Sequence, residues 1–189
     1  MRETHQTFTS TARRFHWWTV AFVAVLVPVG IYMNYRGNVL GIFDEVTNTL
    51  YSAHKLVGFT LLWIIVARLG YRLVRGAPPD EPTLEPWQKV VSKLNHWGMY
   101  ILLLTVPLLG WFGVQLYPAL DVFGLFSLPA LVSPDQATAE RVFAIHKTLA
   151  LVLVGLIAVH VGAALYHYFV RKDGVLQRMI PSLARRDRS

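Results

Sequence analysis

Histidines at particular spacings are the residues best suited to chemistry in this chain of 189 residues. Six of the seven lie in or at the ends of long apolar segments, where an ionisable side chain is costly and usually faces the interior of a helix bundle. One such histidine is equally well explained as an interfacial side chain bound to a lipid headgroup, but six together argue against that explanation. The six are His16, His54, His96, His146, His160 and His167, whereas His5 precedes the first segment and is expected to have no role.

The spacing of His146 and His160 predicts two separate sites. They are 14 positions apart, which corresponds to about 21 Å of helical rise on nearly the same face. They therefore cannot bind one ion, but they can belong to two sites stacked across a membrane about 30 Å thick. If the apolar segments alternate in direction, His54 lies level with His146, and His16 lies level with His160. We call His54 and His146 the outer pair, and His16 and His160 the inner pair.

Paired histidines without any cysteine indicate a particular cofactor. The absence of cysteine excludes disulfides, iron–sulfur clusters and covalently attached haem. Two histidines on facing helices suit the six-coordinate iron of a b-type haem, so two pairs predict two non-covalent haem b groups.

The crowding around each histidine favours the same four ligands. The side chain four positions along a helix is the neighbour most able to obstruct a flat macrocycle. This neighbour is small for three of the paired histidines: Gly58 for His54, Ala150 for His146 and Ala164 for His160. His16 has Ala12 four positions before it and Val20 four positions after it. The neighbours of the other two histidines are large, namely Tyr100 after His96 and Arg171 after His167. Depth alone does not separate His16 from His96, because both enter their segments from the same side.

Four apolar segments have to position these histidines. Only 15% of the residues are charged and the mean hydropathy is +0.41, whereas about 25% of a soluble domain is charged. The charges avoid residues 15–35, 56–67, 94–120 and 148–170, and about 20 helical residues cross a membrane. We therefore expect an all-α integral membrane four-helix bundle that forms one domain over residues 1–189. Its helices are predicted at about 15–35, 52–74, 94–117 and 142–170, followed by a basic cytoplasmic tail over 171–189.

The basic residues indicate how the bundle is oriented. Of the 18 lysines and arginines, 14 lie at the N-terminus, in the 68–93 region or after position 170. The positive-inside rule then places both termini in the cytoplasm, so the net charge of +7 gives little support for a nucleic-acid partner. A signal peptide is disfavoured, because the first apolar run exceeds the usual 7–15 residues and no clear cleavage site follows it. On the opposite side, the apolar loop 118–141 is expected to lie in the interface and to cover that end of the bundle.

Three cationic side chains are candidates for binding haem propionates. Arg68 follows His54 at the spacing that separates His160 from His146, which places it level with the inner pair. A buried arginine needs an anionic partner, although Arg68 can equally extend to the headgroups. Lys55 and Lys147 each follow an outer histidine, where they can bind propionates or mark the interface.

Several motifs together resemble those of the prokaryotic cytochrome b561 family. They are Arg14-Phe-His-Trp17, His54-Lys-Leu-Val-Gly58, His146-Lys147 followed by His160, and the stretch from Ala163 to Met179. The resemblance runs from about His16 to Pro181 and implies a di-haem b protein of the bacterial inner membrane that exchanges electrons with ubiquinone. It also implies axial ligands at the matching positions His16, His54, His146 and His160, and an activity similar to that of a superoxide oxidase. The loop 118–141 departs from the family pattern, which leaves the outer electron donor open.

Three functions from different classes remain. The first is an oxidoreductase that passes electrons from an outer donor, such as superoxide or a periplasmic redox partner, to ubiquinone in the lipid. For its quinone site, His96, His167 and Arg171 are candidates near the cytoplasmic edge, with an interfacial belt as the alternative. The second is the cytochrome b membrane anchor of a larger dehydrogenase. The third, a histidine-dependent transporter, is disfavoured because the histidines form pairs at two levels and no acidic residue lies inside a helix.

Overall fold

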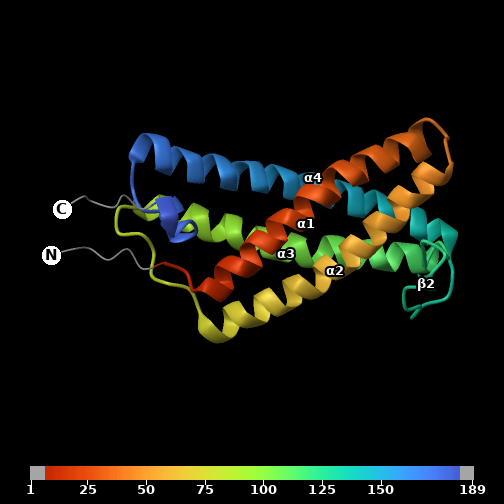
Figure 1. Cartoon of the computed structure of the whole chain (residues 1–189), viewed down its shortest axis with the longest axis horizontal. Helices are drawn as coiled ribbons and strands as arrows, with labels where there is room; N and C mark the ends of the chain where they lie inside the picture. Colours follow the sequence, from red (N-terminus) through yellow and green to blue (C-terminus); the bar gives the residue numbers. More distant parts are fainter. Residues whose placement is uncertain (1–6, 184–189) are drawn as a thin grey trace.

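Four long helices make up most of the computed structural model, which describes residues 7–183 (Figure 1). They are α1 (Ser10–Asn34), α2 (Glu45–Arg75), α3 (Pro86–Leu116) and α4 (Gln136–Tyr166). A π-helical turn extends α1 over Tyr35–Val39, and another extends α4 over His167–Arg171. Each helix is long and apolar enough to cross a membrane. The predicted four-helix membrane bundle is therefore confirmed.

Polar capping residues decide where the helices begin. Asp44 and Asp135 accept hydrogen bonds from the backbone N–H groups of Thr47 and Thr138, and Thr9 accepts one from Ala12. Such caps satisfy the N–H groups that the first helical turn leaves free. Each helix therefore starts several residues before its predicted bound, because an apolar run marks only the part of a helix that lies in hydrocarbon.

The central core lies midway between the two histidine levels. Its buried residues come from three helices, and partly buried side chains of α1, among them Phe22, pack against them. Leu61 and Leu153 each lie seven residues after an outer histidine, on α2 and α4. Many large side chains point outward instead, such as Trp63, which is 56% exposed. A membrane bundle shows this pattern because lipid is as apolar as the core.

The end of the bundle opposite the termini is covered by the loop between α3 and α4 (Figure 1). It contains a short antiparallel hairpin, β1 (Asp121–Val122) and β2 (Phe126–Ser127), which the sequence did not predict. Side-chain hydrogen bonds attach the loop to α3. The Trp111 indole donates to the Pro129 carbonyl at 3.1 Å, and the Leu131 N–H donates to Gln115 Oε1 at 2.7 Å.

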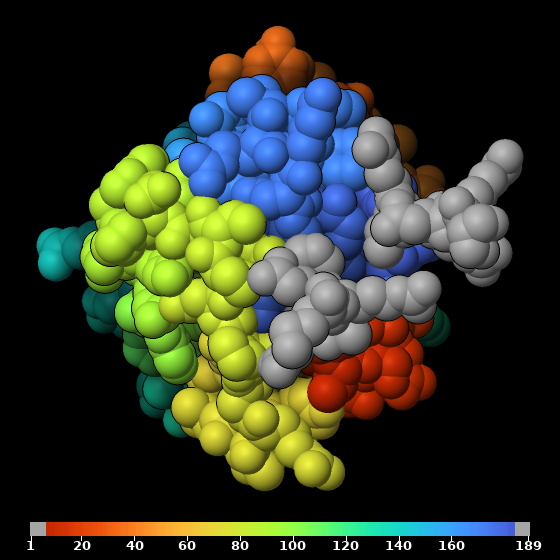
Figure 2. All heavy atoms as spheres, turned by 90° about the vertical axis from the view of Figure 1, so that its left-hand side faces the viewer, coloured from red at the N-terminus to blue at the C-terminus, as the bar shows by residue number. Residues whose placement is uncertain are grey.

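The other end is closed by the segment that follows α4. Seen from that end, the segment lies between the end of α4 and the starts of α3 and α1 (Figure 2). It forms two 3₁₀ turns, Leu176–Arg178 and Pro181–Leu183. Arg178 donates to the Pro79 carbonyl in the α2–α3 connection, and its own carbonyl accepts from the Phe8 N–H at 3.2 Å. The C-terminal segment therefore joins the start of α1 to the connection between the two helical hairpins.

Candidate functional site

The outer pair faces across the bundle from α2 and α4. The ring centroids of His54 and His146 are 6.3 Å apart, and their planes differ by 81°. His146 Nδ1 lies 2.8 Å from the Val106 carbonyl oxygen on α3. Because a carbonyl can only accept, Nδ1 carries the ring proton, and the lone pair of Nε2 is available to a metal.

The inner pair has a similar separation but different neighbours. His16 on α1 and His160 on α4 have ring centroids 6.2 Å apart, with planes at 63°. Arg68 on α2 reaches this level, with Nη2 3.3 Å from His16 Nδ1 and its guanidinium 5.2 Å from the Tyr100 ring centroid. His96 on α3 also lies here, and its ring centroid is 5.0 Å from that of His160.

Both pairs fit an iron ion held between two imidazoles. With metal–nitrogen bonds of about 2 Å on opposite sides, the two ring centroids are about 6.3 Å apart. The outer and inner pairs match this distance, whereas His96 and His160 are closer than it requires. Within residues 7–183, no group of three or more histidine or acidic side chains is arranged so that it could hold one metal ion. The two imidazole pairs are thus the donor sets available, and they suit the iron of a b-type haem.

Comparison with known proteins agrees with this geometry. Residues 7–182 match the family described as prokaryotic cytochrome b561. The chain belongs to that family. It is a multi-pass protein of the bacterial inner membrane that transfers electrons and uses haem b.

This cytochrome b561 family member is similar to proteins of several bacteria. It is 28% identical to cytochrome b561 homolog 2 of Escherichia coli, over 92% of this chain and 94% of the relative. It is 30% identical to cytochrome b561 homolog 1 of the same organism, over 92% and 97%. A protein of Yersinia pestis named probable superoxide oxidase CybB is 30% identical over 68% of this chain and 73% of its own length.

The predicted propionate partners have different environments. The Lys55 ammonium group donates to the carbonyls of Ala119 and Asp121, so it holds the outer loop against α2. Lys147 is exposed. Arg68 contacts the rings of His16 and Tyr100, and no ion pair with a carboxylate is found for it among the described residues. Of these three cationic side chains, Arg68 is the one whose charge most requires an anionic partner at its own level in the bundle.

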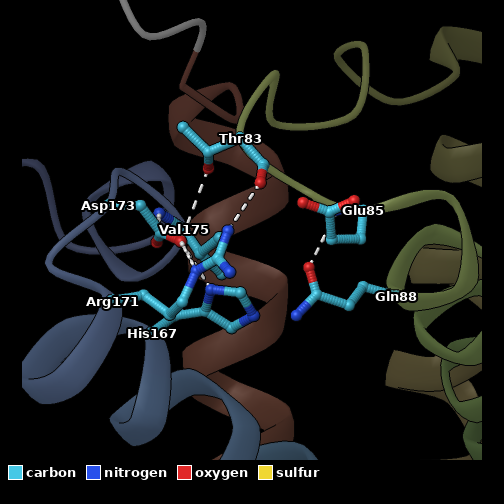
Figure 3. Close-up of polar contacts among 7 residues, drawn as sticks. All are labelled: Thr83, Glu85, Gln88, His167, Arg171, Asp173 and Val175. Carbon is cyan, nitrogen blue, oxygen red and sulfur yellow. Dashed lines mark hydrogen bonds and ion pairs between the residues drawn. The ribbon is translucent and has the colours of Figure 1, made fainter.

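The predicted quinone residues are not all equally accessible. His167 is buried at the end of α4, and its Nδ1 lies 2.6 Å from Asp173 Oδ2 (Figure 3). Arg171 donates to the Thr83 carbonyl at 2.8 Å, while Thr83 Oγ1 donates to the same carboxylate at 3.4 Å. These contacts tie α4 to the connection before α3. His96 is exposed instead, with Nδ1 2.6 Å from the Ser92 carbonyl.

Some contacts at these levels were missed by sequence reasoning. Asp173 carried no prediction of its own, although it falls inside the motif from Ala163 to Met179. The Val106 carbonyl carries no signal in the sequence, because every residue has such a group. His5, for which no role was predicted, lies outside the described residues.

At the outer end, charge is partly neutralised. Arg36 Nη2 lies 2.5 Å from Asp44 Oδ2. The pKa of the Asp44 carboxyl is lowered to about 2, first by the backbone N–H of Thr47 and then by Arg36. The pKa of Asp135 is also lowered, by the Thr138 hydroxyl and backbone N–H. Both carboxyls are therefore ionised at neutral pH, so Arg36 does not present a free positive charge to an approaching anion.

Proposed function

We propose that this family member binds two haem b groups and moves electrons between a donor at the outer end and ubiquinone. His54 and His146 would hold one haem, and His16 and His160 the other. The observation that carries the proposal is the presence of two imidazole pairs with separations of 6.3 and 6.2 Å on helices that can span a membrane. The haems, when bound, supply one-electron redox chemistry.

Ligation by two histidines restricts the kind of reaction. Two imidazoles would leave no open position at the iron, so electron transfer would be favoured over chemistry at the metal. The protein then has to hold the imidazoles and provide counter-charges. The Val106 carbonyl fixes the proton of His146 on Nδ1. At the inner level, ligation through Nε2 places the His16 proton on Nδ1, so Arg68 would turn from that nitrogen to an anionic group such as a propionate.

A small anionic donor such as superoxide fits the outer end. The similarity to the relative named probable superoxide oxidase CybB supports this choice. Lys55 and Arg36 are engaged by loop carbonyls and by Asp44, so the remaining exposed cations at this end are Arg141 and Lys147. Attraction of an anion would therefore be local to the start of α4.

Ubiquinone would accept electrons near the inner pair. Of the three predicted quinone residues, His96 is the best placed, since it is exposed on α3 and its ring lies 5.0 Å from that of His160. His167 is buried and bound to Asp173, and Arg171 is bound to Thr83. Their role would be to keep the membrane edge of α4 in place beside the quinone.

The second candidate function is a membrane anchor for a larger dehydrogenase. The exposed apolar tip of the outer hairpin favours it, because Phe123, Leu125 and Phe126 are 43%, 81% and 48% exposed. Such a patch can dock a periplasmic subunit. Isolation from the native membrane in mild detergent decides between the two, since an anchor co-purifies with a stoichiometric partner and a self-contained oxidoreductase does not.

Haem quantification tests the proposal most directly. We expect the purified chain to carry two haems by the pyridine haemochrome assay, both removable by acid acetone because no cysteine can hold them. The haems should be reduced by superoxide and reoxidised by added ubiquinone. A ratio near one would contradict the two-site proposal, and a ratio near zero, with no reduced-minus-oxidised spectrum, would favour a transporter.

A further inference from the structure

A glycine lies at the point where each outer histidine touches a neighbouring helix. On α1, a Cβ atom added to Gly30 would lie 2.9 Å from Cε1 of His54. On α3, a Cβ atom added to Gly110 would lie 3.0 Å from Cε1 of His146 and 3.2 Å from Nδ1. Carbon atoms in favourable contact are about 3.5–4.0 Å apart. Any side chain at either position would therefore displace the imidazole that rests on it.

Both glycines also leave a backbone carbonyl uncovered. A helical side chain covers the turn on the N-terminal side of its own Cα. Glycine at position 110 therefore leaves open the Val106 carbonyl, one turn earlier, which accepts the Nδ1 proton of His146. On α1, the Leu26 carbonyl stands four residues before Gly30 and interacts with the His54 ring. His54 Nδ1 is buried and has no hydrogen bond of ordinary geometry, so this ring nitrogen still needs an acceptor such as the Leu26 carbonyl.

The same arrangement occurs in both helical hairpins. In the hairpin of α1 and α2, the second helix places His54 on a glycine of the first. In the hairpin of α3 and α4, the second helix places His146 on a glycine of the first. The sequence repeats the pattern. Each glycine follows the histidine of a His-Trp pair at the same spacing, Gly30 after His16-Trp17 and Gly110 after His96-Trp97. Each outer histidine is followed by a lysine, in His54-Lys55 and His146-Lys147.

The inner pair has no equivalent contact with the helical glycines. A Cβ atom added to any of five other glycines on α2, α3 and α4 would meet neither His16 nor His160 within 4 Å: Gly58, Gly70, Gly98, Gly155 and Gly162. The glycine contact is thus particular to the outer level, where it occurs once in each hairpin. Its repetition at the same relative place argues for a shared purpose rather than for chance packing.

We propose that Gly30 and Gly110 are positioning residues for the outer pair. They allow each imidazole to lie directly on a helix backbone, with Nδ1 toward a carbonyl and Nε2 toward the opposite histidine. The rotation of both rings is thereby fixed by the backbone of the first helix in each hairpin. This inference rests on the proposed haem ligation, since the Nε2 atoms it orients are the proposed iron ligands.

Single alanine substitutions test the inference. We expect Gly30→Ala and Gly110→Ala to rotate or displace one outer ring, and to weaken haem binding at the outer site about 10- to 100-fold, as loss of a group that orients a metal ligand does. The low-spin electron paramagnetic resonance signal of the outer haem should shift or diminish, and the haem-to-protein ratio should fall toward one. The outer signal is identified as the one that His146→Ala removes.

The matched controls are Gly70→Ala on α2 and Gly162→Ala on α4. Both glycines are exposed, with nothing within 4 Å of an added Cβ atom, so these variants make the same change in helix propensity and should keep both signals. The inner haem serves as an internal measure of folding in each variant, and Gly110→Ala, with the milder contact, keeps the test valid if Gly30→Ala does not fold.

The outcomes separate the two proposals. Two low-spin haems in the wild type, with an outer signal unchanged in both Gly30→Ala and Gly110→Ala, would overturn the positioning role alone. An equal loss in the Gly70→Ala control would do the same. A wild type without two low-spin haems would overturn the proposed function together with this inference.

Discussion

The outer and inner histidine pairs have nearly equal ring separations, 6.3 and 6.2 Å, but they are built differently. In the outer pair, both histidines lie on the second helix of a hairpin, and both rest against backbone at a glycine. In the inner pair, His16 comes from the first helix of its hairpin and is contacted by the cationic side chain of Arg68. One level therefore uses the two hairpins equivalently, and the other does not.

The difference traces to one position in α2. Arg68 follows His54 at the same spacing as His160 follows His146. At the outer level these two helices supply a histidine each. At the inner level, α2 carries Arg68 instead of a second histidine. The imidazole that pairs with His160 therefore comes from His16 on α1. His96, which corresponds to His16 in the other hairpin, is left beside His160 as an additional imidazole.

Substitution of the two proposed haem ligands on α4 should produce the largest effect. We expect His146→Ala to remove the outer haem alone and His160→Ala the inner haem alone, because each pair loses one of its two ligands. Each variant should carry one haem by the pyridine haemochrome assay, and the double variant His54→Ala with His160→Ala should carry none. Loss of both haems in either single variant would mean that the two levels are not independent.

His96→Ala is the matched comparison for the inner level. We expect it to keep both low-spin haems, since its ring is closer to His160 than two axial ligands of one iron would be. His16→Ala should lose the inner haem. Loss of the inner haem in His96→Ala, with retention in His16→Ala, would assign the inner ligand to α3. The inner pair would then no longer include a histidine from the first helical hairpin.

A rescue experiment of intermediate effect tests the role of position 68. In the His16→Ala background, we expect Arg68→His to restore part of the low-spin inner haem, because α2 would then face α4 with an imidazole at both levels. Arg68→Gln in the same background provides the control, since it removes the charge without supplying a ligand. Equal spectra for the two double variants would show that position 68 cannot reach the iron.

The smallest effect is expected at the start of α2, ten residues before His54. The folded pKa of Asp44, about 2, lies below its ordinary value of 3.8. Its capping is therefore fully present above about pH 4 and is lost as the pH falls through about 2. Asp44→Ala should increase hydrogen exchange at the Thr47 amide at neutral pH while both haem signals stay unchanged, since the outer rings rest on α1 and α3. A shifted outer signal would show that the loop also positions His54.

Much of the fold could be predicted from local features of the chain. The charge-free runs located four helices, and the absence of cysteine, together with the spacing of His146 and His160, indicated b-type haem at two levels. The helix starts were predicted less well, because hydropathy marks the hydrocarbon region and caps such as Asp44 lie beyond it. The repeated hairpin is also hidden in the sequence, since corresponding residues are 80 positions apart in the first helices and 92 in the second ones.

The sequence by itself determined which residues share a level, because helical rise and bilayer thickness are constants that require no knowledge of packing. Only the tertiary structure decided what each imidazole touches. Five contacts depend on the distances between separate segments: those of His54 with Gly30 and of His146 with Gly110, the acceptance by the Val106 carbonyl, the approach of Arg68 to His16, and the hydrogen bond from Arg171 to Thr83. Those distances follow from how closely neighbouring segments pack, and the residue pattern along a single helix carries no information about that packing.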